Sequence, residues 1–276
     1  MSSSNFLSKI IERKQERLAE SKQARTLEEL RREALSARAG ARRHAFREAL
    51  ADAGRVNVIA EFKRASPSKG EIRVGASASE TARAYERGGA AAVSVLTEED
   101  FFRGSLRDLA EVKESVRLPV LRKDFILEDY QVYESAAVGA DALLLIVAAL
   151  DDAALARLRA LAEVELGLDA LVEVHTAEEM KRAADAGARA VGVNNRDLHT
   201  FEVSLETSVR LAPHAPRGAL LVSESGLQTS ADIARLRACG FGAFLVGETL
   251  MRADDPEAAL RYLAGAGGWG DAAPAV

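Results

Sequence analysis

The sequence has very little of several features that define whole classes of protein. Only one cysteine, Cys239, occurs in 276 residues, which excludes an intrachain disulfide and fits a reducing compartment. The first residues lack the apolar core of a signal peptide, and no apolar run approaches the roughly 18 residues of a membrane span. The formal net charge of −5 offers no general basis for binding nucleic acid or an anionic membrane surface. We therefore expect a cytoplasmic protein that binds neither nucleic acid nor membranes.

Motifs for the common metal and nucleotide sites are also missing. His175 stands two residues beyond Glu173 and could join it as a metal ligand, but no third ligand has convincing spacing. The Gly-x-Gly-x-x-Gly turn of dinucleotide-binding sheets does not follow the first predicted strand. The sequence therefore predicts no metal and no cofactor.

What the chain does contain is a regular alternation of short apolar or β-branched runs with amphipathic segments, from residue 55 onward. The eight runs span residues 56–62, 91–96, 119–124, 142–147, 170–174, 190–193, 219–223 and 242–246. Such runs are typical of parallel strands that helices cover on the outside. Eight strand–helix units in about 210 residues are the number and length of a (β/α)8 TIM barrel, an α/β fold. The alternative, a doubly wound open sheet, usually has fewer strands.

The two ends of the chain lie outside this alternation. Residues 1–50 are rich in Ala, Arg, Glu and Leu, and the spacing of Thr26 and Glu29 is that of a helix capping box. One apolar stripe predicts the helix before it: Phe6, Ile10 and Leu18. We expect a helical N-terminal extension that packs on a barrel of residues 51–265. The Gly- and Ala-rich residues 266–276 are predicted to be a disordered tail.

Lys123 is the first candidate for chemistry, because it ends the third predicted strand. Pro119, Leu121 and Lys123 share one face of that strand, since side chains alternate along it. Desolvating an ammonium group is costly, so packing rarely places lysine there. Burial and neighbouring charges can instead move the lysine pKa into a range useful for proton transfer.

Other strand ends supply partners for Lys123, because a barrel gathers the C-terminal ends of its strands at one mouth. The polar residues there are Glu61, Lys63, Lys123, Glu173, Asn194, Arg196 and Glu224. One such residue alone could be a salt bridge that closes the mouth, but so many converging charges favour acid–base catalysis. The fourth strand, residues 142–147, gives no charge and predicts an apolar wall. Phe102 and Phe125 could be core residues or could stack on an aromatic substrate.

The loops after the seventh and eighth strands predict a phosphate site. Ser225, Gly226 and Gly247 allow backbone N–H groups to approach a ligand closely. The alternative is that these glycines only make tight turns. Residues 62–70 add cations and hydroxyls in a loop long enough to be a lid, or an ordinary solvated loop. The residues together predict a barrel enzyme for a small phosphorylated anion.

Six motifs, in order along the chain, resemble one enzyme family. They are AEFKRASPSKG (60–70), VLTEE (95–99), RKDF (122–125), LVEV (171–174), NNRDL (194–198) and SESG (223–226). In this set the chain resembles the indole-3-glycerol-phosphate synthases. The helical extension also resembles the extra N-terminal segment of that family.

The resemblance implies a step of tryptophan biosynthesis. The substrate would be 1-(2-carboxyphenylamino)-1-deoxyribulose 5-phosphate, which closes to indole-3-glycerol phosphate with loss of carbon dioxide and water. Lys123 would be the general acid that protonates the ribulose carbonyl oxygen, and Glu173 the base of the final dehydration. Lys63 would bind the substrate carboxylate and is a second candidate for moving protons, with Glu61 and Glu224 tuning the site.

The same resemblance implies substrate and phosphate contacts. Asn194 and Arg196 would orient the substrate. The phosphate would be held by Ser66, Ser225, Gly226 and Gly247. Glu248 occupies a position where many relatives carry serine, so its side chain must turn away and its contribution is a backbone N–H at most.

Two other functions are weighed against this one. Phosphoribosylanthranilate isomerase is a barrel with a similar phosphate site, but it would use a cysteine and an aspartate, and Cys239 is misplaced for that role. A barrel that binds phosphorylated ligands without turnover is the second alternative. The intact set of Lys123, Glu173 and Lys63 argues against it. We expect a monomer whose partner is a small phosphorylated molecule.

Overall fold

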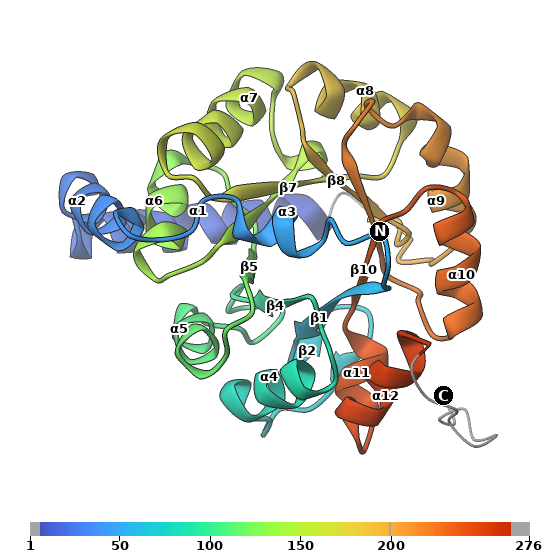
Figure 1. Cartoon of the computed structure of the whole chain (residues 1–276). Coiled ribbons are helices and arrows are strands. Elements are labelled where there is room, and N and C mark those ends of the chain that lie inside the picture. The colour runs from blue at the N-terminus through green and yellow to red at the C-terminus, as the bar shows by residue number, and fades with distance from the viewer. Residues whose placement is uncertain (1–5, 199, 266–276) are drawn as a thin grey trace.

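The computed structural model describes residues 6–198 and 200–265 (Figure 1). Within them, parallel strands close into a barrel in the order β1–β10–β9–β8–β7–β6–β5–β4. These strands are β1 (Asn57–Phe62), β4 (Ala92–Leu96), β5 (Val120–Lys123), β6 (Ala142–Ile146), β7 (Asp169–Val174), β8 (Ala190–Asn194), β9 (Leu220–Glu224) and β10 (Ala243–Val246). The predicted (β/α)8 barrel is therefore confirmed. No helix in the described part of the chain is long and apolar enough to cross a membrane.

Helices cover the outside of the barrel and connect its strands (Figure 1). They are α4 (Ala78–Arg87), α5 (Leu106–Ser115), α6 (Asp129–Ala137), α7 (Asp152–Ala160), α8 (Ala177–Asp185), α9 (Glu206–Leu211), α10 (Ser230–Ala238), α11 (Glu248–Arg252) and α12 (Pro256–Leu263). Three short helical turns complete the connections: the 3₁₀-helices η1 (Val147–Ala149) and η3 (Ala212–His214) and the π-helix η2 (Leu161–Glu165). Side-chain caps fix several helix starts: Ser77, Ser105, Asp151, Thr176 and Thr229 each accept a first-turn N–H.

Side chains alternate between two apolar cores. Ile59, Leu121 and Leu171 point into the barrel, where they belong to the inner core. Their neighbours Val58 and Val172 point outward and pack in the core beneath the helices. Because successive strand residues face opposite sides, the register also decides which polar residues at the strand ends face the barrel interior. The fourth barrel strand, β6, is buried throughout and is the apolar wall that the sequence predicts.

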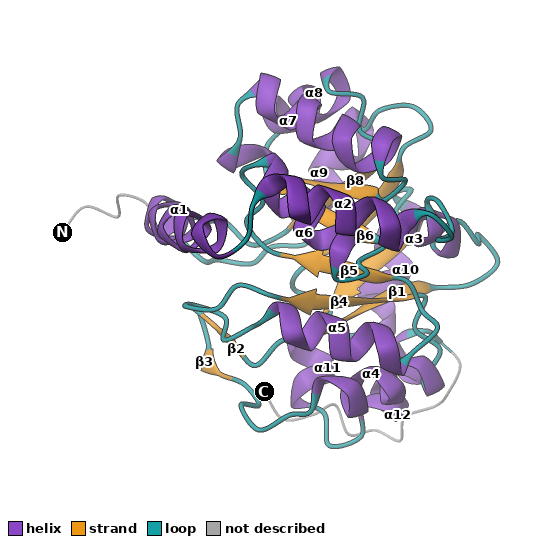
Figure 2. Ribbon diagram, turned by 90° about the vertical axis from the view of Figure 1, so that its left-hand side faces the viewer, coloured by secondary structure: helices purple, strands orange, loops and turns teal. Residues whose placement is uncertain are grey.

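The first residues form α1 (Phe6–Ala24), α2 (Leu27–Arg38) and α3 (Ala45–Ala49). Figure 2 shows α1 on one side of the barrel and α3 on the other. Phe46 of α3 joins the inner core at the N-terminal end of the strands, where the Arg47 N–H donates to the Asp169 carboxylate. Leu7 and Ile10 of α1 join the same core. The capping box predicted at the start of α2 is present.

The loop after β1 has more structure than the sequence predicts. It contains β2 (Ala65–Ser66) and β3 (Gly70–Glu71), which pair as an antiparallel hairpin. Two-residue strands are too short to leave an alternating pattern. In Figure 2 this hairpin lies on the same side of the barrel as α1.

Candidate active site

Lys123 lies between two buried carboxylates at the C-terminal ends of the barrel strands. Its Nζ is 3.1 Å from Glu173 Oε2 and 3.2 Å from Glu224 Oε2. The three side chains come from β5, β7 and β9, and the Glu173 and Glu224 side chains are only 2% and 1% exposed. The strand ends thus bring together a cation and two carboxylates that lie far apart in the sequence.

Charge at this site decides the protonation state of Lys123 and Glu173. Burial alone would lower the pKa of Lys123, but Glu173, Glu224 and Glu61 together raise it above its usual range. Burial alone would raise the pKa of Glu173, but the positive charges of Lys123 and His175 hold it below its ordinary value. At neutral pH the site therefore presents an ammonium beside an ionised carboxylate.

Glu224 has the opposite character. Burial raises its pKa to about 7, although Lys123 opposes that shift. Both of its carboxylate oxygens are buried, and the group that faces them is the Lys123 ammonium, 3.2 Å from Oε2. Room for it is made by Gly192 on β8, where an added Cβ would come closer than 3.0 Å to Glu224 Oε1. Glu224 therefore binds a proton more readily than Glu173 does.

Glu61 and Lys63 form a second ion pair at the end of β1. Lys63 Nζ lies 2.8 Å from Glu61 Oε1, with the carboxylate buried and the ammonium partly exposed. Gly247, directly after β10, leaves the space for this carboxylate, since a Cβ there would also come closer than 3.0 Å to Glu61 Oε1. The pair places a second lysine at the same mouth as Lys123.

Asn194 ends β8 and connects the site to the loop after β9. Its Oδ1 accepts from the Ser225 hydroxyl at 2.9 Å and from the Arg196 N–H at 3.0 Å. The Arg196 guanidinium donates to the Phe201 carbonyl at 3.2 Å, so it is held on its own loop. Asn195, which the sequence analysis does not single out, is buried and donates to the Ser225 carbonyl at 3.1 Å.

Backbone conformation prepares the two loops predicted to hold phosphate. Ser225 and Gly226 are consecutive left-handed residues, with φ of 67° and 80°. Thr249 Oγ1 donates to the Leu227 carbonyl at 2.8 Å, which ties α11 to the loop after β9. Ser66 is buried in β2. The hydrogen bond between Thr249 and Leu227 holds the loops after β9 and β10 side by side.

The Glu248 side chain contacts cations rather than the backbone of the loop. Arg252 Nε donates to Glu248 Oε1 at 3.1 Å, and Lys69 Nζ lies 3.7 Å from the same oxygen. The carboxylate charge is thus partly neutralised by two side chains. That only the backbone of Glu248 faces an anion stays a prediction.

An aromatic group lies beside the ends of β4 and β5. The rings of Phe102 and Phe125 have centroids 6.5 Å apart, tilted by 40°. Phe6 of α1 makes edge contacts with Phe101 and Phe201, with centroids 5.2 and 5.4 Å away. The N-terminal helix therefore lies over the same mouth as the charged residues.

A buried ion network that the sequence analysis does not predict holds α1 over the mouth. Lys14 Nζ lies 2.8 Å from Asp124 Oδ1, and Arg122 Nη2 lies 3.0 Å from Asp124 Oδ2. All three side chains are almost fully buried. Because Asp124 directly follows Lys123, this network fixes both α1 and the end of β5. Lys14 lies four residues from both Ile10 and Leu18 on the buried stripe of α1. This position in the sequence indicates that its ammonium group needs a buried partner.

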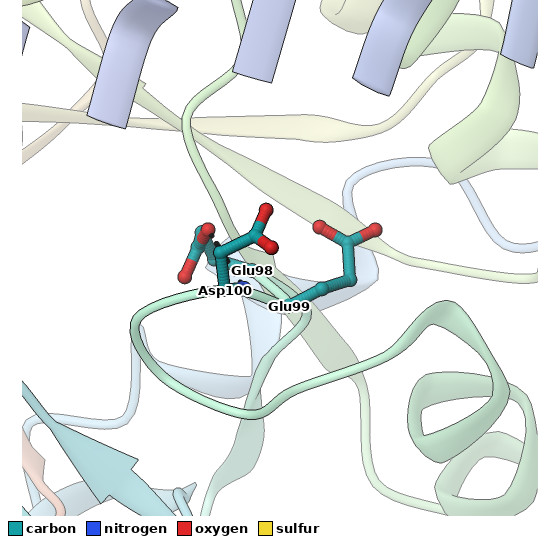
Figure 3. Close-up of side chains that lie close together, drawn as sticks. All are labelled: Glu98, Glu99 and Asp100. Carbon is teal, nitrogen blue, oxygen red and sulfur yellow. Dashed lines mark hydrogen bonds between the residues drawn. The ribbon is translucent and has the colours of Figure 1, made fainter. Parts of the chain in front are cut away.

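Three carboxylates in the loop after β4 lie close enough to hold a metal ion together: Glu98, Glu99 and Asp100 (Figure 3). Each one has other partners. Glu98 accepts the N–H groups of Asp100, Phe101 and Phe102. Glu99 pairs with Lys14 at 3.0 Å, and Asp100 pairs with Arg13 and Arg17 at 3.2 and 2.7 Å. Glu99 and Asp100 therefore fasten α1 to the barrel, while Glu98 shapes the loop that carries them.

Comparisons with known proteins agree with this geometry. Residues 7–263 match the family model described as indole-3-glycerol phosphate synthase. A protein from Syntrophobacter fumaroxidans described as indole-3-glycerol phosphate synthase is 48% identical over 265 residues, which cover 95% of this chain and 98% of that protein.

Solved structures with similar folds share much less sequence. Thiamine phosphate pyrophosphorylase from Pyrococcus furiosus has a TM-score of 0.57 and 18% identity, covering 75% of this chain and 93% of that one. A mandelate oxidase mutant has a TM-score of 0.56 and 18% identity, covering 80% and 83%. These two similarities concern the fold alone.

Proposed function

The chain belongs to the indole-3-glycerol phosphate synthase family, and we propose which of its residues perform the reaction of that family. The enzyme is a decarboxylating carboxy-lyase of tryptophan biosynthesis. It closes 1-(2-carboxyphenylamino)-1-deoxyribulose 5-phosphate to indole-3-glycerol phosphate with loss of carbon dioxide and water. The reaction has three steps: ring closure, decarboxylation and dehydration. Ring closure and dehydration each need a proton transfer, whereas decarboxylation needs none.

Lys123 is the general acid of ring closure. The aromatic carbon that bears the carboxylate attacks the ribulose carbonyl, whose oxygen becomes an alkoxide and needs a proton. The carboxylates of Glu173 and Glu224, 3.1 and 3.2 Å from the ammonium, keep Lys123 charged before the substrate arrives. The contact of Lys123 with these two buried carboxylates is the observation that carries the proposal. Loss of carbon dioxide then restores the aromatic ring without an external electron sink.

Glu173 is the base of the dehydration. The hydroxyl left by ring closure departs as water, and a proton leaves the neighbouring methylene carbon to form the indole double bond. Lys123 and His175 keep Glu173 ionised, as a base must be. Because Glu173 also touches Lys123, the proton it accepts can return to the acid over 3.1 Å.

The remaining mouth residues bind the substrate. Lys63, held by Glu61, would face the substrate carboxylate, and Glu224 would tune the charge of Lys123. Asn194 and Arg196 would orient the ribulose chain. Phe102 and Phe125 would pack against the anthranilate ring. The phosphate would lie between Ser66, the turn of Ser225 and Gly226, and the backbone of Gly247 and Glu248.

Several other expectations stay predictions. They are the monomeric state, the cytoplasmic location, the lack of nucleic-acid binding, and catalysis without a metal or cofactor. The division into an extension (1–50), a barrel (51–265) and a tail (266–276) is also a prediction, and the tail lies outside the described residues.

The function is tested by supplying the purified chain with the carboxyphenylamino-deoxyribulose phosphate. We expect indole fluorescence to appear together with carbon dioxide. Phosphoribosylanthranilate, supplied separately, should not be turned over, because Cys239 caps the end of α10 instead of lying at the mouth. Folded protein that forms no indole would contradict the assignment, and turnover of phosphoribosylanthranilate would favour the isomerase.

A further inference from the structure

A line of ionisable side chains leads from the first turn of α8 to the proposed acid. Glu179 Oε2 lies 3.2 Å from His175 Nδ1, and His175 Nε2 lies 3.4 Å from Glu173 Oε1. Glu173 Oε2 continues the line to Lys123 Nζ at 3.1 Å. Exposure falls along the line, from 17% for the Glu179 side chain to 11% for His175 and 2% for Glu173. The line thus runs from a partly exposed carboxylate to a buried one.

His175 sits between two carboxylates, which is unusual for a neutral imidazole. A neutral ring has one N–H, so either Nδ1 would turn a lone pair toward Glu179 or Nε2 would turn one toward Glu173. Only the imidazolium can donate to both. Its Nε2 is buried and has no hydrogen-bond partner among the described residues, so Glu173 is the group it faces. The backbone N–H of His175 also donates to Glu179 at 2.7 Å, which fixes the ring against α8.

The reaction itself requires a proton from solvent. The carbonyl oxygen leaves as water and so gains two protons, whereas the methylene carbon next to it gives up only one. The substrate loses its carboxylate as neutral carbon dioxide, so its charge balance shows the same deficit of one proton. Each turnover therefore returns one proton through Glu173 and must import another from outside.

We propose that His175, with Glu179, is the proton-relay and positioning residue that supplies this second proton through Glu173 to Lys123. The Nε2–H bond of His175 breaks as an O–H bond forms on Glu173, and rotation of the carboxyl group carries that proton to the Lys123 amine. His175 is then neutral, with its remaining proton on Nδ1 beside Glu179. A change of tautomer moves that proton to Nε2, and Nδ1 then accepts a solvent proton that Glu179 passes on, so one N–H bond forms for the one that broke and the imidazolium is restored. A substrate bound in the mouth would separate Lys123 from solvent, so a proton route from the side of α8 would still reach it. The inference rests on the proposed roles of Lys123 and Glu173.

The pH dependence supports the same arrangement. Three carboxylates face His175: Glu173 on β7, Glu179 on α8 and Glu224 on β9. Lys123 lies beyond Glu173. Burial alone would lower the pKa of His175, but these carboxylates raise it above its usual value. The imidazolium in turn lowers the pKa of Glu173. Removing it should therefore raise the pKa of the base.

The test is the variant His175→Asn in the full chain. We expect kcat to fall about 10- to 100-fold with KM changed less than about twofold, since only a proton-transfer step is affected. The acidic limb of the kcat profile should move to higher pH. Added imidazole should restore kcat in a saturable way, which a purely structural loss would not allow. Glu179→Gln keeps an acceptor for the His175 N–H but cannot relay protons, and should show the same direction of change.

His44→Asn is the matched control. His44 also contacts a carboxylate, with Nδ1 3.3 Å from Asp169 Oδ1, but at the opposite end of the barrel. It should leave kcat, its pH profile and the imidazole response unchanged. The inference is overturned if His175→Asn keeps normal kcat and pH profile, or loses activity without any rescue by imidazole. If Lys123→Ala and Glu173→Gln retained normal turnover, the proposed acid and base would be wrong instead.

Discussion

Replacing Lys123 with alanine should reduce turnover by about 10²–10⁴-fold, the usual contribution of a general acid. The ammonium is the cation that lies within 3.2 Å of both Glu173 and Glu224. Without it, the alkoxide formed in ring closure has no donor, and the charge that keeps Glu173 ionised is weakened. We expect kcat to fall far more than KM, because the lost interaction matters most in the transition state.

Lys123→Arg sharpens this prediction. Arginine keeps the positive charge between the two carboxylates, but its guanidinium does not give up a proton at accessible pH. The arginine variant should therefore fold with stability closer to the wild type than the alanine variant and still be nearly inactive. Indole fluorescence measures the turnover of both. Near-normal turnover in either would show that the acid lies elsewhere, with Lys63 as the next candidate.

Replacing Asp124 with asparagine should lower the free energy of unfolding by about 3–5 kcal/mol, the cost of breaking a buried ion pair from one side. Asp124 accepts from Lys14, Arg122, Thr97 and its neighbour's N–H, at distances from 2.6 to 3.0 Å. Its removal leaves two cations buried without their shared anion. Urea unfolding followed by circular dichroism measures the loss.

The pH dependence of this loss follows from the sign of the pKa shift. Burial alone would raise the pKa of Asp124, but Lys14, Arg122 and Thr97 hold it below its ordinary value. A carboxylate with a depressed folded pKa stabilises fully above its unfolded pKa, about 4, and loses that contribution as pH falls further. The difference between wild type and Asp124→Asn should therefore be full at neutral pH and shrink in acid.

Asp100→Asn is the control for this network. Asp100 also pairs with α1, through Arg13 and Arg17, but its partners are about two-fifths exposed to solvent. Exposed ion pairs contribute roughly 0–1 kcal/mol. If Asp124→Asn cost no more than Asp100→Asn, the buried network would not be what holds α1 over the mouth.

The barrel and most of the polar residues at its mouth could be predicted because both depend on short sequence patterns. The strands are apolar runs, several of them carry a polar residue at or near their end, and eight such runs separated by helices have the number and length of a (β/α)8 barrel. Glu173 and Lys123 are therefore predictable from their places at strand ends. Their contact follows from the parallel strand order, in which only β6 separates β5 from β7.

Features that depend on tertiary neighbours could not be predicted in the same way. Gly192 matters because Glu224 fills the space above it, and only the register of β8 against β9 shows that. Helix α1 was expected, but its amphipathic pattern does not say where it docks. Lys14 on the buried stripe of α1 was a visible signal of a buried partner, and Asp124 supplies it. The spacing of His175 and Glu173 suggests a metal ligand, and the contact with Glu179 on the next helix is visible only in the structure.

The division of labour between Lys123 and Glu173 is tested most directly by a single-turnover measurement of carbon dioxide and indole together. If Lys123 drives ring closure and Glu173 the later dehydration, Glu173→Gln should release carbon dioxide promptly while indole appears slowly. Lys123→Ala should release neither at the wild-type rate, because decarboxylation follows ring closure. Carbon dioxide held back as strongly as indole in Glu173→Gln, or released normally in Lys123→Ala, would contradict the assignment.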